Sequence, residues 1–570
     1  MTENPQSAGR NIGYIVGGGL RENLRIRLTV DPQEVQEGAF IVVESAGWFF
    51  YGLVTDLALG ATDPRFADEQ SEKRLPAELA RLLHGQTLYT TLEMLPALMM
   101  ETGPEPGSPG YDEWANFHQE GESGILPIKT IPSHHAAARL ARASDVARIF
   151  GSPDKPGNFV LGFTREQGLP VCVDLKKMIQ RSAGIFGATG SGKSFLTRIV
   201  LAGLIQQDLA STLIFDMHNE YGWDDTASDT NEKVHGLRSK FSTKVRMVGL
   251  GRDNTVRGQS PDLYLEIGEE DITPEDIELL SRTLNLRETT PTTLEALQQS
   301  YGREWFHQFR AMKVGVMIEG EDGKKIPAPE SVAFWANETG VNVAAAEGLR
   351  SKLNRVFDLP YVVTNKMENT LQDIITNLAQ GKHVVLSFGK HENDLDYLLV
   401  TNILTRRIRE TWETKVNAYR SNPGTTPEPR QLVVVVEEAH KLLNREMASQ
   451  TTFSTIAREL RKYYVTLLVI DQRPSQIYDE VMSQLGTRIS GWLGDEDDIH
   501  AVLSGLAGRD ALRGMLAHLQ PKEEVLMLGW GVPMPILLRT RRYDDTFWKE
   551  LKGDLEGKKS PEEQLKKLGF

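Results

Sequence analysis

The chain has 570 residues, enough for three or four domains of roughly 150 residues each. Its 64 lysines and arginines are outnumbered by 78 aspartates and glutamates. The resulting net charge of −14 means that the average field of the protein repels nucleic acid unless the basic groups are segregated. A composition with 40% hydrophobic and 25% charged residues excludes a disordered or fibrous chain.

Apolar runs such as Leu432 to Val436 are far shorter than the roughly 20 residues that a membrane span needs. The polar start MTENPQSAGR lacks the layout of a secretory signal. We therefore expect a cytoplasmic protein without membrane contact. The single cysteine, Cys172, excludes an internal disulfide, and its flanks LPVCVDL predict a buried strand rather than a nucleophile.

The first 60 or so residues predict β-structure. Leu24, Ile26, Leu28 and Val30 alternate with polar residues, which is the period of a strand with one buried face. Two further apolar runs follow, GAFIVVES and GWFFYGLVTDLAL, each introduced by a glycine. Several short strands separated by turns predict a small barrel or sandwich, because one hairpin alone buries too little surface to be stable.

From Ser182 onward, strands alternate with helices, which predicts an α/β core with parallel strands. The strand signal disappears between about Thr273 and Tyr361, where successive helical patterns predict a helical insertion. Thr273 is a good helix start because a proline and an acidic first turn follow it. Two more strand patterns, EVLMLGW and MPILLRT, close the core.

These patterns divide the chain into five parts. They are an N-terminal β-barrel domain with an extension (1–175), the first part of the α/β core (176–270), the helical insertion (271–365), the second part of the core (366–545) and a charged C-terminal tail (546–570).

The octapeptide GATGSGKS matches the P-loop pattern GxxxxGK[ST] between an apolar run and a helical pattern. Its glycines let backbone N–H groups turn toward phosphates, aided by the positive end of the following helix. Lys193 is expected to neutralise the β and γ phosphates of ATP, and Ser194 to hold Mg²⁺ through its hydroxyl. The predicted nucleotide-binding residues are Gly187, Ala188, Thr189, Gly190, Ser191, Gly192, Lys193, Ser194 and Phe195.

The run LVVVVEEAH ends a predicted strand in two acids, Glu437 and Glu438. A P-loop needs such a partner, so Glu437 is expected to hold Mg²⁺, directly or through water, and Glu438 to orient and deprotonate the attacking water. In isolation, the same pair of acids could equally begin a solvated helix.

Three further residues are candidates for catalysis. Gln472 follows the next predicted strand, where a polar amide can sense the γ-phosphate. Arg458 and Arg461, in the segment IARELRKYY, could reach the γ-phosphate of a neighbouring subunit, and Arg461 is the favoured one. The alternative is a basic helix end that complements the helix dipole.

The segment FDMHNEYGW follows another predicted strand and carries Asp216, His218 and Glu220. These residues could suggest a metal site, but no second ligand cluster accompanies them. A role beside the nucleotide or in a subunit contact is the favoured interpretation.

Together, these motifs resemble the HerA branch of the HerA/FtsK superfamily of ring-shaped DNA-translocating ATPases. The resemblance covers nearly the whole chain and rests on YGLVTDL, GATGSGKS, FDMHNEYG, GLRSKLNRVFDLPYV, GKHVVLSFG, VVVVEEAH, ARELRKYY and DQRPSQIYDEVMSQLGTRIS. The chain departs from the family at Asn219 and Leu460, where the family patterns have glycine.

The resemblance implies a RecA-like P-loop core, an N-terminal barrel of the HAS type, and a homohexameric ring that moves double-stranded DNA by ATP hydrolysis with Mg²⁺. It also implies a partner on the barrel face, either a NurA-like nuclease in DNA end processing or a sirtuin-like or other effector in antiphage defence. The alternative is a hexameric scaffold in which nucleotide sets the assembly of a partner effector.

A DNA channel binds phosphates through lysine and arginine without reading bases. The candidates are Arg238, Lys240 and Lys244, together with Lys441 and Arg445, and solvated surface charge is an equal alternative for each.

Overall fold

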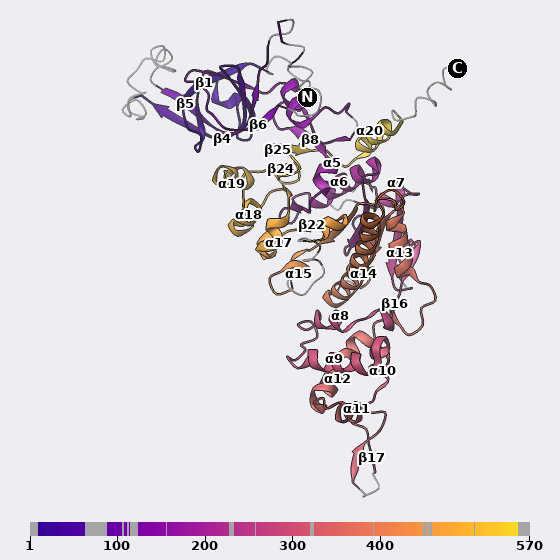
Figure 1. Cartoon of the computed structure of the whole chain (residues 1–570). Helices are drawn as coiled ribbons and strands as arrows, with labels where there is room; N and C mark the ends of the chain where they lie inside the picture. The colour runs from indigo at the N-terminus through magenta and orange to yellow at the C-terminus, as the bar shows by residue number, and fades with distance from the viewer. Residues whose placement is uncertain are drawn as a thin grey trace, which may run out of the picture. The chain divides into compact units, whose positions relative to one another are not determined.

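A computed structural model of the chain describes residues 9–62, 88–104, 108–110, 113, 124–155, 157–226, 233–252, 254–256, 258–319, 324–391, 393–447, 453, 456, 459–506 and 508–556. Its contacts divide the chain into two compact units. Unit 1 comprises Met1–Gly203, Gln472–Ser475 and Leu485–Phe570, and unit 2 comprises Leu204–Asp471 and Gln476–Gln484. Figure 1 labels many of the elements of the two units. The division of the chain at 175, 270, 365 and 545 stays a prediction.

A closed barrel of six strands lies at the N-terminal end of unit 1, drawn in indigo in Figure 1. The strands follow one another around the barrel in the order β2-β1-β7-β3-β4-β5, and β5 pairs with β2 to close it. Their bounds are β1 Asn11–Gly17, β2 Leu24–Leu28, β3 Phe40–Ser45, β4 Trp48–Ala61, β5 Leu88–Glu101 and β7 Ala137–Leu140. The short β6, Ile125–Pro127, pairs with the C-terminal end of β5.

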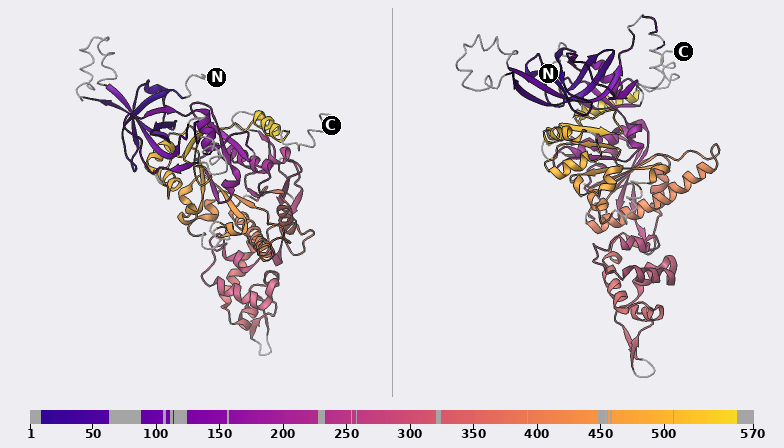
Figure 2. Two further views of the ribbon diagram at one scale, coloured as in Figure 1. Left: turned by 45° about the horizontal axis from the view of Figure 1, so that its top comes forward. Right: turned by 60° about the vertical axis from the view of Figure 1, so that its left-hand side comes forward.

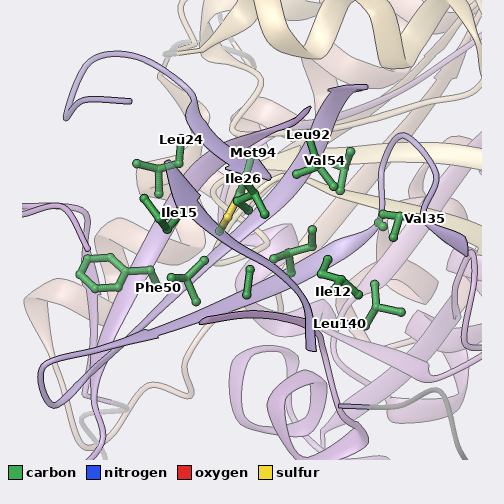
Figure 3. Close-up of a cluster of buried hydrophobic side chains, with 14 of the residues drawn as sticks. Ile12, Ile15, Leu24, Ile26, Val35, Phe50, Val54, Leu92, Met94 and Leu140 are labelled. Carbon is green, nitrogen blue, oxygen red and sulfur yellow. The ribbon is translucent and has the colours of Figure 1, made fainter. Parts of the chain in front are cut away.

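The inner face of the barrel carries its apolar residues. Ile15, Ile26, Phe50 and Met94 pack there with the other buried side chains that are drawn in Figure 3. The alternation predicted from residues 24–30 is the reason, since every second side chain of a strand points to the same face. The predicted N-terminal barrel is confirmed.

The rest of unit 1 is built on a mixed set of strands. β10, which precedes the P-loop, pairs in parallel with β23, and β24, β25, β8 and β9 follow in antiparallel order. The bounds are β8 Asn158–Thr164, β9 Pro170–Asp174, β10 Ala183–Phe186, β23 Thr487–Ser490, β24 Glu524–Gly529 and β25 Ile536–Thr540. The closing strands predicted from EVLMLGW and MPILLRT are confirmed as β24 and β25.

Strands β8 and β9 belong to this second sheet and not to the barrel, because β8 pairs with β25. The extension of the predicted barrel domain therefore contributes to the sheet that carries the P-loop strand. Cys172 lies buried in β9, as predicted, and burial raises the pKa of its thiol to about 11.

The helices described in unit 1 are α4 Ala143–Phe150, α5 Leu175–Ile179, α18 Glu496–Leu503, α19 Arg509–Ala517 and α20 Asp545–Glu556. Unit 1 also holds the greater part of α6, Lys193–Gln207, whose last residues are assigned to unit 2. α20 begins the predicted C-terminal tail. It buries Phe547, Trp548 and Leu551, so this part of the tail is docked against unit 1.

Unit 2 contains six parallel strands in the order β15-β14-β20-β11-β21-β22. Their bounds are β11 Ser211–Asp216, β14 Val245–Leu250, β15 Leu263–Leu265, β20 His383–Ser387, β21 Leu432–Glu437 and β22 Val465–Asp471. The accompanying helices are α7 Leu237–Lys240, α13 Thr370–Ala379, α14 Asp394–Ser421, α15 His440–Leu443 and α17 Asp479–Gln484. Strands β11, β20 and β21 are buried along their whole length, which explains their continuous apolar sequences.

The helical insertion also lies in unit 2, where its helices gather in both views of Figure 2. Their bounds are α8 Pro274–Glu278, α9 Thr290–Tyr301, α10 Trp305–Ala311, α11 Val332–Thr339 and α12 Val343–Phe357. The strand signal was expected to be absent from Thr273 to Tyr361, but β17, Met317–Glu319, and β18, Lys325–Pro327, form a hairpin there. Just outside this range, β16, Ile267–Gly268, pairs with β19, Val362–Val363. The hairpin carries only three paired positions, too few to give an alternating pattern in the sequence.

The helix start predicted at Thr273 is confirmed, because the Asp276 carboxylate accepts the Thr273 backbone N–H at 2.8 Å. Arg406 of α14 donates to the same carboxylate at 2.9 Å, which ties the insertion to the core of unit 2. The predicted α/β class with a helical insertion is confirmed. No helix in the described part of the chain is both long enough and apolar enough to cross a membrane.

Candidate active site

The predicted P-loop of unit 1 is a tight turn between β10 and α6. Gly190 and Gly192 have φ angles of +76° and +92°, a conformation that side chains disfavour. A Cβ atom on Gly192 would lie 3.2 Å from the Cα of Lys522, so the backbone of another loop also approaches closely there. The glycines of the motif are therefore explained by the conformation of the loop itself.

The side chains of the P-loop make local contacts. The Lys193 ammonium donates to the carbonyl oxygens of Gly187 at 2.6 Å and of Ala188 at 3.0 Å. The Thr189 hydroxyl donates to the side-chain oxygen of Gln472. The hydroxyl of Ser191 is buried and finds no hydrogen-bond partner among the described residues.

These features fit a phosphate group. The loop ends at the N-terminus of α6, a helix of 15 residues whose first backbone N–H groups and dipole favour an anion. Lys193 and Ser194 occupy its first two positions and are half-buried. The unsatisfied Ser191 hydroxyl supplies a further donor on the inside of the turn.

Phe195, also predicted to bind nucleotide, is exposed, and its ring centroid lies 6.2 Å from that of Tyr543. Lys522 is a neighbour of the P-loop that the motif does not contain. Its backbone N–H donates to the Ser191 carbonyl at 3.2 Å, and it lines a small hollow with Lys193 and Gly192.

In unit 2, the end of β11 is followed by a turn that a buried carboxylate holds together. Asp216 is fully buried and accepts the backbone N–H groups of Glu220, Tyr221 and Gly222 at 2.7, 3.0 and 3.1 Å. Burial raises the pKa of Asp216, and these three hydrogen bonds oppose the rise. Asn219 has a φ of +57°, a conformation that asparagine tolerates better than most residues, which explains how it replaces the family's glycine.

Glu437 is the last residue of β21, and its carboxylate is buried beside the end of β11. The Tyr221 hydroxyl donates to its Oε1 at 2.6 Å. Its Oε2 is buried and has no hydrogen-bond partner among the described residues. Burial, together with the nearby Asp216 carboxylate, raises the pKa of Glu437 well above its usual range.

This arrangement fits a divalent cation. A buried carboxylate with one fixed and one unsatisfied oxygen, in surroundings that are rich in negative charge, gains stability when a cation replaces the proton. Hard cations such as Mg²⁺ prefer oxygen ligands of this kind. The Glu437 carboxylate therefore fits the metal-binding role predicted for it.

Glu438 is half-buried and has a φ of +45°, an uncommon conformation for a residue with a side chain. Its Oε2 lies 3.6 Å from Nδ1 of His440. Asp471, at the end of β22, accepts the His440 backbone N–H at 2.7 Å and contacts Nδ1 at 3.0 Å. The hydrogen bond to Asp471 raises the pKa of His440, so this imidazole carries positive charge over a wider pH range than usual.

Of the two arginines predicted to act on a neighbouring subunit, the structure describes only Arg461. Arg461 lies in a 3₁₀ turn, Leu460–Tyr463, and is exposed. Arg458 lies outside the described residues.

The alternative of a metal site at Asp216, His218 and Glu220 finds no support. The Asp216 carboxylate is occupied by backbone N–H groups, and His218 is exposed. Within the described ranges, no group of three or more His, Cys, Asp or Glu side chains could hold a metal by itself.

Three of the basic residues proposed for a DNA channel have partners within unit 2. Arg238 donates to Asp262 at 2.7 Å, and Lys441 pairs with Asp394 at 2.8 Å. Lys244 donates to the Ile205 carbonyl at 3.1 Å. Arg445 is exposed and Lys240 is half-buried.

Sequence reasoning assigned no role to four residues beside these motifs, namely Tyr221, His440, Asp471 and Lys522. The first three stand in the motifs FDMHNEYG, VVVVEEAH and DQRPS, so the available signal was a polar residue at a strand end or up to five positions after it. Lys522 stands in no motif.

Comparison with known families supports the resemblance. Residues 159–408 match the family model described as "Helicase HerA, central domain". The chain is 23% identical to the "DNA double-strand break repair helicase HerA" of Sulfolobus acidocaldarius over 94% of this chain and 93% of that protein. It is 24% identical to the protein of the same name in Saccharolobus solfataricus, over 84% of this chain and 81% of that one.

Among solved structures, the chain is similar to VirB4 of Thermoanaerobacter pseudethanolicus, with 15% sequence identity and a TM-score of 0.42. The similarity covers 69% of this chain and 99% of the VirB4 chain. It is also similar to the bacterial conjugative coupling protein TrwB, with 13% sequence identity and a TM-score of 0.42. That similarity covers 71% of this chain and 92% of the TrwB chain.

The predicted resemblance to HerA-type P-loop ATPases is thus confirmed, and it extends from the barrel to the C-terminal strands. With its complete P-loop, the chain is an ATP hydrolase.

Proposed function

We propose that the chain is an ATP-driven translocase on double-stranded DNA that works as a homohexameric ring. The observation that carries this proposal is the similarity to DNA repair helicases over 94% of the chain, barrel included, together with an intact P-loop. A shared P-loop alone would support only nucleotide hydrolysis, because this loop serves many functions.

The P-loop and the acidic end of a neighbouring strand act on one nucleotide in P-loop ATPases. Lys193 neutralises the β and γ phosphates, and Ser194 and Glu437 hold Mg²⁺. Mg²⁺ held there would supply positive charge against the negative charge that develops on the phosphate oxygens. Glu438 orients the attacking water and takes its proton.

Gln472 and Arg461 complete the set. Gln472 is held by the Thr189 hydroxyl of the P-loop, so a change in the loop on nucleotide binding reaches it directly. Arg461 is exposed, as a residue must be if it is to reach the nucleotide of a neighbouring subunit. The contact of Gln472 with Thr189 and the exposure of Arg461 support the roles inferred from the sequence.

The cellular role that we propose is the processing of DNA ends. It is supported by the printed names of the relatives, which are double-strand break repair helicases. The partner of the ring would then be a NurA-like nuclease, or a sirtuin-like or other defence effector. A nucleotide-dependent scaffold remains the alternative outcome of the experiment that follows.

The test is displacement of a third strand from a triplex at the end of a duplex, measured with wild-type protein, Glu438→Gln and the control Glu446→Gln. Glu446 is an exposed carboxylate that pairs with Arg282. We expect displacement by the wild type and the control but not by Glu438→Gln, whose hydrolysis should fall by about 100-fold or more. ATP turnover without displacement would contradict translocation.

A further inference from the structure

We propose that Tyr221 is a positioning residue for the magnesium ligand of this ATPase: its hydroxyl fixes the Glu437 carboxylate through Oε1 and leaves Oε2 available to a cation. The inference rests on the proposed function and deepens it, because it assigns a task to the FDMHNEYG motif. Three features of unit 2 carry it.

The first feature is the rigidity of the turn that carries Tyr221. Asp216 gathers three successive backbone N–H groups, one of which is that of Tyr221 itself. Ser387 of β20 donates to the Asn219 side-chain oxygen in the same turn. Because the buried side chains of Asp216 and Ser387 both hold this turn, the backbone that carries the Tyr221 side chain is fixed in position.

The second feature is the contact itself. Tyr221 is fully buried, and its hydroxyl lies 2.6 Å from Oε1 of Glu437, a short and charge-assisted geometry for this pair. β11 and β21 are neighbours in parallel register, with Phe215 opposite Val436, so the turn after β11 lies next to the end of β21. The contact joins residues 216 positions apart.

The third feature is the asymmetry that this bond creates in the carboxylate. Oε1 is occupied by the tyrosine, whereas Oε2 is buried without a hydrogen-bond partner among the described residues. An unsatisfied buried carboxylate oxygen is costly unless a ligand satisfies it. Residues that orient a metal ligand in this way typically change metal affinity by about 10- to 100-fold when they are removed.

A second buried tyrosine offers a matched control. The Tyr397 hydroxyl donates to the main-chain carbonyl of Glu437 at 2.7 Å and not to its carboxylate. Tyr221 and Tyr397 are both fully buried and both contact the same residue, so Tyr→Phe removes one hydroxyl from equivalent surroundings. Only the loss of the Tyr221 hydroxyl should release the carboxylate.

The experiment measures Mn²⁺ binding by electron paramagnetic resonance in the presence of a non-hydrolysable ATP analogue. Wild type, Tyr221→Phe and Tyr397→Phe are compared, and thermal unfolding of each is recorded in parallel. We expect Tyr221→Phe to bind Mn²⁺ about 10- to 100-fold more weakly and Tyr397→Phe to bind it within about twofold of the wild type.

A magnesium titration of ATP turnover supplies a second readout. Tyr221→Phe should regain most of its rate at high Mg²⁺ concentration, since the ligand is misplaced but present. A purely structural role would lower stability and rate without shifting the metal dependence.

Equal Mn²⁺ affinity in the wild type and Tyr221→Phe would overturn the inference, as would equal losses in the two variants. Either result leaves triplex displacement by the wild type intact, so it is distinguishable from failure of the proposed function. If the wild type neither binds Mn²⁺ with the analogue nor hydrolyses ATP, both are overturned.

Discussion

The P-loop and the acidic end of β21 are built in different ways. The P-loop is shaped by its own backbone: positive φ angles at Gly190 and Gly192 and two bonds from Lys193 to neighbouring carbonyls lie within eight consecutive residues, 187–194. Glu437, in contrast, is held by Tyr221 and Tyr397, which come from distant parts of the sequence. The conformation of the P-loop is therefore determined by a short sequence motif, whereas the position of the Glu437 carboxylate depends on tertiary packing.

This difference has a mechanical consequence. Substitutions in the P-loop should remove chemistry while they leave the fold in place, because the affected contacts are local. Substitutions around Glu437 should change stability and activity together, because the same buried groups connect β11, β20 and β21.

The largest effect is expected for Lys193→Ala. Removal of this ammonium takes away the positive charge at the β and γ phosphates, so ATP turnover should fall by about 100-fold or more. Stability in urea should stay within about 0.5 kcal/mol of the wild type. The exposed Lys155 supplies the control Lys155→Ala, which should keep full turnover. A large loss of stability in Lys193→Ala would break the proposed contrast.

Asp216→Asn tests the other side of the comparison. The asparagine side chain cannot accept all three backbone N–H groups, because its NH₂ group is itself a donor and would face some of these donors. We therefore expect the free energy of unfolding to fall by about 1–3 kcal/mol. Turnover should fall as well, since the turn carries Tyr221. Urea unfolding and ATPase rate measure both effects, and Asp373→Asn on the exposed side of α13 is the control. Unchanged stability would show that the turn is not held by Asp216.

A smaller and graded effect is expected at Asn219. Its φ of +57° is easy for glycine and costly for a β-branched residue. Asn219→Val should lower stability by about 1–2 kcal/mol, whereas Asn219→Gly, the residue of the family pattern, should cost less than about 1 kcal/mol. Thermal unfolding of the two variants ranks them, and the reverse order would contradict the conformation described for this turn.

The smallest effect concerns pH. The hydrogen bond to Asp471 raises the pKa of His440 above its unfolded value of about 6.5. A group with a raised folded pKa adds stability that is complete below the unfolded value and is lost as the pH rises through the folded pKa. The wild type should therefore lose about 1 kcal/mol more than His440→Gln between about pH 6 and pH 9. Parallel urea unfolding curves at the two pH values would argue against this contact.

The same contrast explains which parts could be predicted from the sequence. The P-loop residues, the barrel alternation and the Thr273 helix start depend on neighbours in the sequence, and each was recognisable there. The strand ending in Glu437 was also predicted, but its partner was not, because no local signal shows that Tyr221 will meet a residue 216 positions away.

The fold follows the same rule. Strands β8 and β9 were recognisable as strands, yet their membership in the sheet of β25 depends on a pairing across more than 350 residues of sequence. The β17–β18 hairpin escaped prediction because its strands are only three residues long and carry no alternation.

The most direct test of the central claim is ATP turnover by the wild type with and without blunt double-stranded DNA, at low and high salt. The account predicts a rate that rises several-fold with duplex and loses this stimulation as salt weakens phosphate contacts. ATP turnover that is abundant and indifferent to duplex DNA would contradict a DNA motor.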